Sequence, residues 1–450
     1  MKVLLISANT NTEPYAVYPL GIDYVAGAIG ARHQVKVVDM NTLAGYPALE
    51  VLISAYNPHL VGIGLRNVDT TDATNLRGFV GNYQELVSAV RKASRALIVL
   101  GGSGFTIFPR QLMQRLGADY GVVGEGERLA LLADAIEAGK NPVGMTGVIT
   151  PRDSKAATPP PLNQFCARRF RADDTGLQFY LKRGGMMNLQ TKRGCKFNCI
   201  YCTYPHIEGR RLRFMPPGEV AQTALELQAA GARYLFVTDA VFNADYAHSA
   251  AVAGAFKKVG LTVPWGAFFT PTDAPAGYYD QLAAAGMTHA EFGTEALSDP
   301  VLRAYKKPFR EPQVYQAHQK ARQAGLHVAH YLLLGGPGEN FDTLAKTLEN
   351  VEKLNRCALF FFCGMRIYPH TDLYATALRE GQISETQSLL TPVFYRSEAL
   401  DERKILAQVR QQAGGRTNWV IGAGGKETAA IMGRMYRRGY SGPLWDYLIS

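Results

Sequence analysis

The chain carries three cysteines within one short stretch near its middle, RGCKFNCIYC at residues 193–202. They are Cys195, Cys199 and Cys202, and no fourth cysteine lies nearby. Six cysteines in 450 residues are too few for a disulfide framework, so this group points to metal binding or catalysis. A structural zinc ion usually needs four ligands, which His206 could complete, whereas a 4Fe-4S cluster on three thiolates keeps one iron open. The three cysteines therefore favour an iron–sulfur cluster with an open iron.

The cysteines follow the first strand candidate of a long alternating series. Helical stretches such as PPGEVAQTALELQAAG separate the strand patterns of this series. Six strands with such crossovers predict an incomplete parallel barrel of the TIM type, whose chemistry lies at its carboxyl-terminal mouth. The strand candidates are residues 185–192, 232–240, 263–270, 288–296, 327–336 and 357–369.

The N-terminal third shows an independent strand and helix alternation. It predicts a five-stranded, doubly wound parallel sheet of the Rossmann-like α/β class over roughly residues 1–140. Its strand candidates are residues 2–8, 34–41, 59–67, 96–104 and 119–127. Such sheets bind ligands at the carboxyl ends of their strands, where glycines let the backbone approach a ligand closely. The candidate binding residues at these ends are Asn9, Arg66, Asn67, Gly101, Gly102, Ser103, Gly124 and Glu125, with Asp69 beside them.

These patterns divide the chain into four parts. We expect a ligand-binding sheet domain at residues 1–142, a proline-rich linker at 143–182, the barrel at 183–385 and a helical C-terminal region at 386–450. The whole architecture is α/β.

Composition limits the partners and the location of the protein. The net charge is +10, from 48 basic and 38 acidic side chains, but no long Lys/Arg run appears, so we expect a basic surface and no nucleic-acid partner. The start, MKVLLISANTNTEP, turns polar after a few apolar residues. It predicts neither a signal peptide nor a membrane span, which places the protein in the cytoplasm.

The spacing of the cysteines resembles the signature of the radical S-adenosylmethionine superfamily, Cys-x-x-x-Cys-x-aromatic-Cys. Here the aromatic position is Tyr201, and the motif follows the first barrel strand as in that family. The resemblance implies that the open iron binds the amino and carboxylate groups of S-adenosylmethionine. It also implies a 5'-deoxyadenosyl radical and an electron donor such as flavodoxin or ferredoxin.

Other barrel segments resemble the same superfamily. Glu295 matches the acid that holds the amino-acid part of the cosubstrate, and Asp239 lies in a stretch similar to one of cobalamin-dependent members. The resemblance places Tyr201 and Asp239 at the catalytic site. It also implies that the turn of Gly335, Gly336 and Pro337 meets the adenine side. Lys306 and Lys307 are expected to face solvent.

The N-terminal part resembles the cobalamin-binding domain of one large branch of this superfamily. The matching segments are residues 18–39, 100–109 and 121–127, and glycines of GGSG would line the channel for the cobalamin tail. No Asp-x-His-x-x-Gly follows the first strand, so the histidine that ligates cobalt in the mutases is missing. The resemblance therefore implies cobalamin with that face unligated or facing water, or a fold that persists without the cofactor.

Three functions are compatible with these expectations. The resemblance implies methylation of an unactivated carbon in a small molecule or lipid. The rival is a radical enzyme for cyclisation, carbon–carbon bond formation or rearrangement without methyl transfer, and the third is a non-enzymatic iron–sulfur or cobalamin carrier. A methylthiotransferase is disfavoured because a further cysteine triad is absent.

Overall fold

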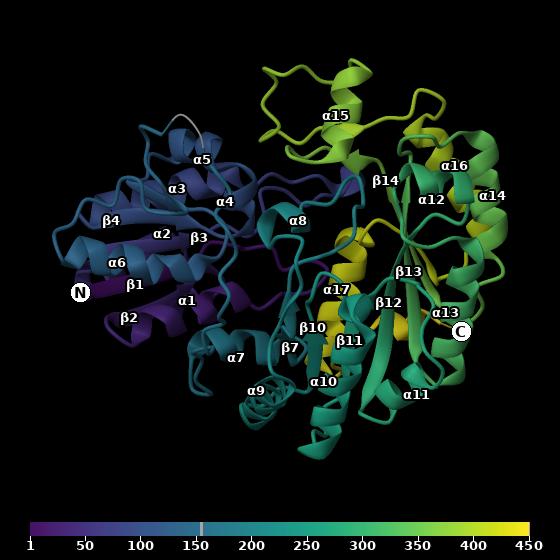
Figure 1. Cartoon of the computed structure of the whole chain (residues 1–450), viewed down its shortest axis with the longest axis horizontal. Coiled ribbons are helices and arrows are strands. Elements are labelled where there is room, and N and C mark those ends of the chain that lie inside the picture. The colour runs from purple at the N-terminus through teal and green to yellow at the C-terminus, as the bar shows by residue number, and fades with distance from the viewer. Residues whose placement is uncertain (154–155, 450) are drawn as a thin grey trace.

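The computed structural model describes residues 1–153 and 156–449, and it contains two α/β units side by side (Figure 1). The N-terminal unit is drawn in purple and blue, and the second unit runs from teal to yellow. No helix in the described residues is both long and apolar enough to cross a membrane.

The N-terminal unit is built on a six-stranded sheet in the order β2-β1-β3-β4-β5-β6. The first five strands are parallel, as the sequence predicts, while the short β6 runs antiparallel to β5. This sixth strand was not predicted, because two residues are too few to show an alternating pattern. The strands are β1 (Lys2–Ser7), β2 (Gln34–Asp39), β3 (Leu60–Gly64), β4 (Leu97–Gly101), β5 (Tyr120–Val122) and β6 (Val148–Ile149).

Helices cover both faces of this sheet. In β1, Leu4 and Ile6 belong to one apolar cluster, while Val3 and Leu5 point to the opposite face and belong to another. A central parallel strand buried on both faces explains the unbroken apolar run at the start of the sequence. The helices are α1 (Leu20–Gly30), α2 (Tyr46–Tyr56), α3 (Val80–Ala93), α4 (Ser103–Ile107), α5 (Pro109–Leu116) and α6 (Leu129–Glu137).

The second unit is an incomplete barrel of seven parallel strands in the order β17-β14-β13-β12-β11-β10-β7. Six of them are the predicted strands. The seventh, β17, lies in the region predicted to be helical, so that prediction is wrong there. The strands are β7 (Met186–Leu189), β10 (Tyr234–Val237), β11 (Trp265–Phe269), β12 (Met287–Glu295), β13 (His327–Leu334), β14 (Ala358–Cys363) and β17 (Trp419–Ile421).

Helices and short hairpins surround the barrel sheet. Small two-stranded ladders join β8 (Lys192–Arg193) to β9 (Arg213–Phe214) and β15 (Met365–Arg366) to β16 (Phe394–Tyr395). The helices after the first strand are α8 (Tyr204–Ile207), α9 (Pro217–Ala229), α10 (Tyr246–Lys258), α11 (Tyr278–Ala283), α12 (Asp299–Ala304), α13 (Glu311–Gln323), α14 (Phe341–Val351), α15 (Asp372–Arg379), α16 (Glu402–Ala413) and α17 (Gly425–Arg437).

The predicted linker is fastened to both units. It contains β6 and α7 (Thr175–Lys182). The Arg168 guanidinium lies 2.8 Å from the Asp23 carboxylate of α1 and donates to the Asn188 carbonyl of β7 at 2.8 Å. Both charged side chains of the pair are buried. A semi-rigid connection between the two units follows.

The carboxyl-terminal sides of the two sheets meet each other. Asp69, which follows β3, forms a buried ion pair with Arg366 of β15 at 3.0 Å. The Asp72 carboxylate accepts a hydrogen bond from the Ala423 amide, just after β17, at 3.2 Å. The ligand-binding edge of the N-terminal sheet therefore faces the mouth of the barrel.

Candidate active site

The three cysteines lie on a loop between β8 and α8 that has no regular secondary structure. Gly194 opens this loop with φ +92°, and a Cβ there would lie 2.3 Å from the Arg211 carbonyl oxygen. Only glycine fits this turn. The Cys195 amide donates to Gly209 O at 3.1 Å, and the Cys202 amide donates to Cys199 O at 3.2 Å. The backbone thus holds the loop in a fixed path.

The three thiols are free and share one loop. Burial, together with the charges of Cys199 and Cys195, raises the pKa of Cys202 to about 12. Burial also raises the pKa of Cys195. Cysteine thiols become thiolates when they bind a positive metal centre. This donor set fits a 4Fe-4S cluster with one iron free of protein ligands.

Asp239 lies beneath this loop as the centre of a buried network. Its carboxylate accepts hydrogen bonds from the Thr191 amide at 2.7 Å and from the Lys192 ammonium at 2.7 Å. Lys192 also donates to the Phe242 carbonyl oxygen at 2.8 Å, and both charged side chains are 1% exposed. With both oxygens engaged, Asp239 fixes β8 and the start of the cysteine loop. This geometry favours a positioning role over the catalytic role expected from the sequence.

Glu125 joins the N-terminal unit to the same hairpin. Its Oε1 lies 2.9 Å from Arg193 and 2.6 Å from Arg213, and Glu127 lies 2.7 Å from Arg193. Burial opposes ionisation of Glu125, but hydrogen bonds from Arg213, from the Leu162 amide and from Arg193 lower its pKa overall. We expected Glu125 to contact a cofactor, whereas its carboxylate is occupied by arginines that support the cysteine loop.

Glu295, Tyr201 and Lys307 form a polar group beside the cysteines. The Tyr201 hydroxyl donates to Glu295 Oε1 at 2.6 Å, and Lys307 lies 3.2 Å from the same oxygen. Burial raises the pKa of Tyr201, and charges at Glu295, Cys199 and Cys202 raise it further. The carboxylate that we expect to hold the amino-acid part of S-adenosylmethionine is thus next to the sulfurs.

The neighbouring lysines 306 and 307 have opposite environments. Lys306 is exposed and pairs with Asp372 at 2.7 Å, as expected. Lys307 is only 7% exposed, so the prediction that it faces solvent is wrong. Lys306 has φ +55°, and this sharp turn after α12 directs the next side chain inward. No local sequence signal distinguishes the two residues.

The turn after β13 packs tightly against the barrel. The Gly336 amide donates to the Tyr305 hydroxyl at 3.1 Å, and a Cβ on Gly336 would lie 2.4 Å from that oxygen. The Gly335 amide donates to the Glu339 carboxylate. Burial raises the pKa of Glu339 to about 7, and its Oε1 has no partner. Gly335 and Gly336 therefore form a fixed backbone turn, and the contact of this turn with adenine stays a prediction.

The candidate cobalamin residues gather at the carboxyl ends of β3 and β4. The Ser103 hydroxyl donates to the Arg66 carbonyl oxygen at 2.9 Å, and Arg66 Nε donates to Asn67 Oδ1 at 2.7 Å. Gly102 has φ +98°, and a Cβ there would lie 2.7 Å from Leu65 O. Gly101 ends β4. A close-packed edge without side chains suits a flat ligand such as a corrin ring.

Arg66 is the unpaired charge on this edge. Burial lowers the pKa of its guanidinium, and within the described residues no carboxylate forms an ion pair with it. One Nη donates to the Val17 carbonyl oxygen at 3.3 Å. A half-buried cation without an acid is partly desolvated and uncompensated, so Arg66 is suited to face a bound ligand.

The remaining candidates lie on the same edge but farther from Arg66. The Asn9 carbonyl accepts from the Asn41 side chain at 2.8 Å. Gly124 has φ +78°, and its amide donates to Thr106 Oγ1 at 3.0 Å. Both hold the edge together.

His206 does not act as a free zinc donor in this structure. Its Nε2 lies 3.3 Å from Thr106 O, its Nδ1 lies 3.4 Å from Thr158 Oγ1, and its ring stacks on His370 at 4.2 Å. Both ring nitrogens already have partners, which disfavours the zinc alternative for the cysteine loop.

Sequence reasoning missed the pairing of several charged residues, most of which join the two units, while Lys307 pairs within the barrel. These are Glu127, Arg193, Arg213, Lys307 and Arg366, together with the pairing of Asp69. Only Arg193 directly follows a predicted strand, where side chains meet at the edge of a parallel sheet, so the set as a whole has no common sequence signal.

Two family descriptions match consecutive parts of the chain. Residues 6–133 match the B12 binding domain, and residues 189–351 match the Radical SAM superfamily. The matches contain β2 to β5 of the first sheet and β10 to β13 of the second, and they include Arg66, the three cysteines and Glu295.

Curated relatives and solved structures agree with this arrangement. The tryptophan 2-C-methyltransferase of Streptomyces laurentii is 26% identical, over 82% of this chain and 73% of that protein. The cytidylyl-2-hydroxyethylphosphonate methyltransferase of Streptomyces wedmorensis is 23% identical, over 86% and 84%. The structure of the radical S-adenosylmethionine methyltransferase TsrM from Kitasatospora setae, with tryptophan and a S-adenosylmethionine analogue bound, has a TM-score of 0.90 at 22% identity and covers 99% and 97%.

Proposed function

The chain belongs to the radical S-adenosylmethionine superfamily, in the branch with an N-terminal B12-binding domain, and we propose that it methylates a carbon atom of a small molecule. When bound, the 4Fe-4S cluster supplies electrons, S-adenosylmethionine supplies the methyl group, and cobalamin carries it. Cys195, Cys199 and Cys202 would hold the cluster.

The observation that carries this proposal is the contact between the edge of the N-terminal sheet and the mouth of the barrel. The Asp69–Arg366 pair joins the candidate cobalamin edge to the barrel at 3.0 Å. Arg193 of the cysteine hairpin pairs with Glu125 of the N-terminal unit at 2.9 Å. Methyl transfer through cobalamin requires that cosubstrate, corrin and acceptor lie within one space closed to water. Two separate electron or cofactor carriers would not require these buried contacts.

Residues of the barrel mouth would position the cosubstrate. The Glu295 carboxylate would accept a hydrogen bond from the amino group of S-adenosylmethionine. Lys307 and Tyr201 hold the Glu295 carboxylate in place. The backbone of Gly335 and Gly336 would meet the adenine. On the opposite edge, the fixed Ser103 to Arg66 contact and the glycines would support the corrin ring.

An aromatic inner wall indicates the class of acceptor. Phe268 of β11 is 37% exposed, and its ring lies 4.8 Å from Phe236 and 6.4 Å from Tyr331. Tyr331 stacks on Phe360 at 4.9 Å. Such a surface binds planar or apolar groups by stacking. We infer that the methyl acceptor is an aromatic small molecule and not a lipid. A flavodoxin or ferredoxin would supply electrons to the cluster.

The test is anaerobic incubation with a low-potential reductant, S-adenosylmethionine and a panel of aromatic compounds, including tryptophan. We expect one compound to gain the mass of one methylene group per turnover, and we expect no gain with the Cys199→Ala variant. Formation of 5'-deoxyadenosine without a mass gain would establish the non-methylating rival. Neither product with any member of the panel would argue for the carrier.

A further inference from the structure

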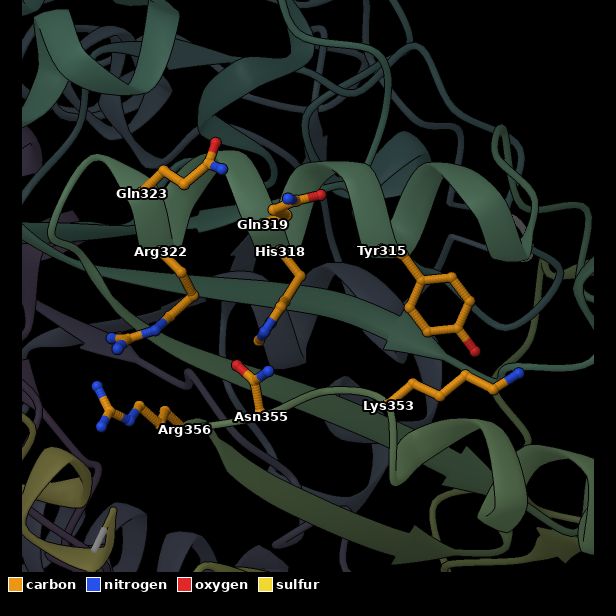
Figure 2. A pocket seen from close by; sticks show the side chains of 8 residues that line it. All are labelled: Tyr315, His318, Gln319, Arg322, Gln323, Lys353, Asn355 and Arg356. Atoms are coloured by element: carbon orange, nitrogen blue, oxygen red, sulfur yellow. The ribbon is translucent and has the colours of Figure 1, made fainter.

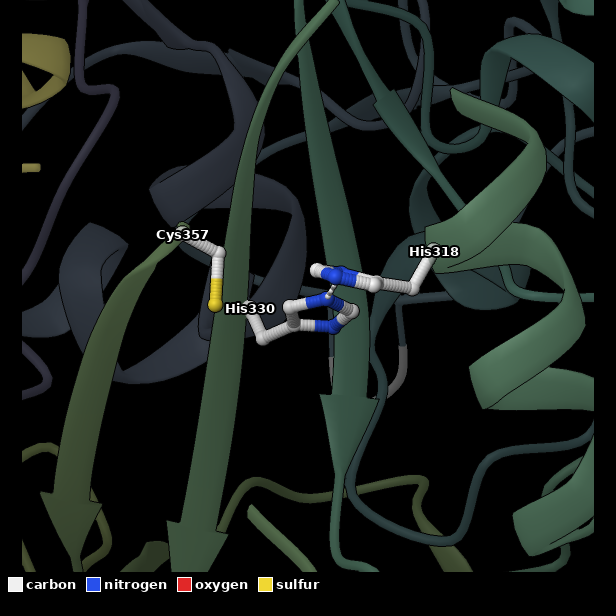
Figure 3. A group of neighbouring side chains, drawn as sticks. All are labelled: His318, His330 and Cys357. Carbon is white, nitrogen blue, oxygen red and sulfur yellow. Dashed lines mark hydrogen bonds between the residues drawn. The ribbon is translucent and has the colours of Figure 1, made fainter. Parts of the chain in front are cut away.

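A second group of metal-binding side chains lies on the outer side of the barrel. It consists of His318 from α13, His330 from β13 and Cys357, which directly precedes β14 (Figure 3). One ring nitrogen of each histidine and the cysteine sulfur all lie within 4.8 Å of one another. These residues are separate from the cysteine loop and from every residue used in the proposed reaction.

The group is embedded in an apolar layer. His330 and Cys357 are 0% exposed, and His318 is 5% exposed. Their neighbours along the chain on the same inner surfaces, Ala321 and Val328, are buried and apolar. Polar side chains in such a layer are costly unless a specific partner compensates them. Three side chains of two metal-binding types, histidine and cysteine, are therefore concentrated where ordinary packing would place aliphatic residues.

The contacts within the group have the form of a zinc site. His318 Nδ1 lies 3.0 Å from His330 Nε2. Two nitrogens that bind one tetrahedral zinc ion are about 3.3 Å apart, so a small shift converts this contact into coordination. His330 Nδ1 lies 2.8 Å from Thr294 Oγ1, a contact that fixes the ring. Such a second contact orients most histidines that bind metals and leaves Nε2 directed toward the ion.

A surface cavity borders the group at His318. It has a volume of about 710 Å³ and is lined by His318, Arg322, Lys353, Asn355 and Arg356, among others (Figure 2). His318 projects toward Asn355, and its buried Nε2 has no hydrogen-bond partner in the described residues. The cavity gives a route for an ion to enter and room for a water molecule on this nitrogen.

We propose that His318, His330 and Cys357 bind a zinc ion that fastens α13 to β13 and β14. Nitrogen and thiolate donors suit zinc and exclude magnesium and calcium, which prefer oxygen. Binding converts the Cys357 thiol to a thiolate and releases its proton to solvent, so no redox partner is needed. The thiol now donates to Leu354 O at 3.4 Å, and this carbonyl is an oxygen donor within reach of the fourth position.

The experiment measures zinc in the full-length holoprotein after adventitious metal is removed with a mild chelator. We expect about one zinc ion per chain and X-ray absorption at the zinc edge that shows one sulfur at about 2.3 Å with nitrogen neighbours. Cys357→Ser is expected to lower the zinc content at least tenfold. Cys363→Ser is the matched control, because Cys363 is also buried, at the other end of β14, but outside the group.

Two further variants keep the result decisive. If Cys357→Ser fails to fold, His318→Gln at the edge of the cavity replaces it, and its zinc content is compared with that of Gln319→Ala on the exposed side of α13. The Cys195→Ala/Cys199→Ala/Cys202→Ala variant is expected to retain its zinc, which separates this site from the cluster loop. Zinc that is absent, that lacks a sulfur neighbour, or that survives both substitutions in the group would overturn the proposal.

Discussion

The barrel mouth and the N-terminal edge that faces it hold their charges differently. In the barrel, Asp239 pairs with Lys192 and Glu295 pairs with Lys307. On the N-terminal edge, Arg66 is half-buried and forms no ion pair with an acid among the described residues. A mouth neutralised by its own pairs is rigid before any ligand arrives, whereas an unpaired half-buried cation depends on a ligand. This difference indicates that the barrel is organised in advance and that the N-terminal edge is completed by its cofactor.

The largest effect should come from breaking the most deeply buried pair of the barrel. Asp239→Ala leaves the Lys192 ammonium buried without its carboxylate and is expected to lower the free energy of unfolding by about 3–5 kcal/mol. Urea unfolding of the protein without cofactors measures this loss. The Asp239→Ala/Lys192→Met variant removes both charges and should recover much of it. A loss below about 1 kcal/mol in the single variant would show that the pair does not organise the mouth.

Glu339 is an exception to this pairing in the barrel, since its buried carboxyl has no cationic partner among the described residues. Its pKa is raised to about 7 by burial, above the unfolded value of 4.5. The folded state therefore binds the extra proton between these values, and stability falls as the pH rises from 4.5 to 7, by about 3 kcal/mol in total. Glu339→Gln should remove this fall and be more stable than the native chain at pH 8. If the free energy of unfolding changes equally between pH 5 and pH 8 in the native protein and in Glu339→Gln, this prediction is contradicted.

The adjacent lysines 306 and 307 test whether a buried ion pair contributes more to stability and cosubstrate binding than an exposed one. Lys307→Met leaves Glu295 with only its Tyr201 hydrogen bond and is expected to cost about 2 kcal/mol of stability and to weaken S-adenosylmethionine binding. Lys306→Met removes an exposed pair and should cost less than about 1 kcal/mol. Calorimetric titration with S-adenosylmethionine compares the two variants. Equal affinities in both would remove Lys307 from the site.

The smallest effect should have the opposite sign. Arg66→Met replaces a half-buried cation that has no ion-pair partner among the described residues with an apolar chain, so the protein without cofactors should become more stable by about 1 kcal/mol. The same variant should retain less cobalamin after gel filtration. Thermal unfolding and corrinoid absorbance measure the two effects. If the variant is less stable and retains cobalamin normally, the proposed difference between the barrel mouth and the N-terminal edge is wrong.

Local patterns in the sequence predicted the parts of the structure that depend on local order. The cysteine loop and the long apolar strands were predicted because spacing and periodicity are visible within a few residues. The three-residue β17 was missed because it is a strand only through its pairing with β14, some sixty residues earlier.

The partners of charged side chains could not be predicted for the same reason. Glu125 meets Arg193 and Arg213, which are 68 and 88 residues away in the chain. Nothing near Glu125 in the sequence shows whether its carboxylate faces a ligand or an arginine. Lys306 and Lys307 have the same local sequence, but the backbone turn at Lys306, with φ +55°, leaves one side chain exposed and the other buried. The types of residue at the site were predictable, but their pairing depends on how the two units meet.

The most direct test of the account asks whether the N-terminal edge holds a corrinoid that receives the methyl group. The protein is reconstituted anaerobically with its cluster and hydroxocobalamin, freed of unbound cofactor, reduced, and supplied with S-adenosylmethionine deuterated in its methyl group. The account predicts near-stoichiometric corrinoid bands and deuterated methyl label on the protein-bound corrinoid before any acceptor is added. Cluster absorbance without retained corrinoid, or retained corrinoid that never acquires the label, would contradict it.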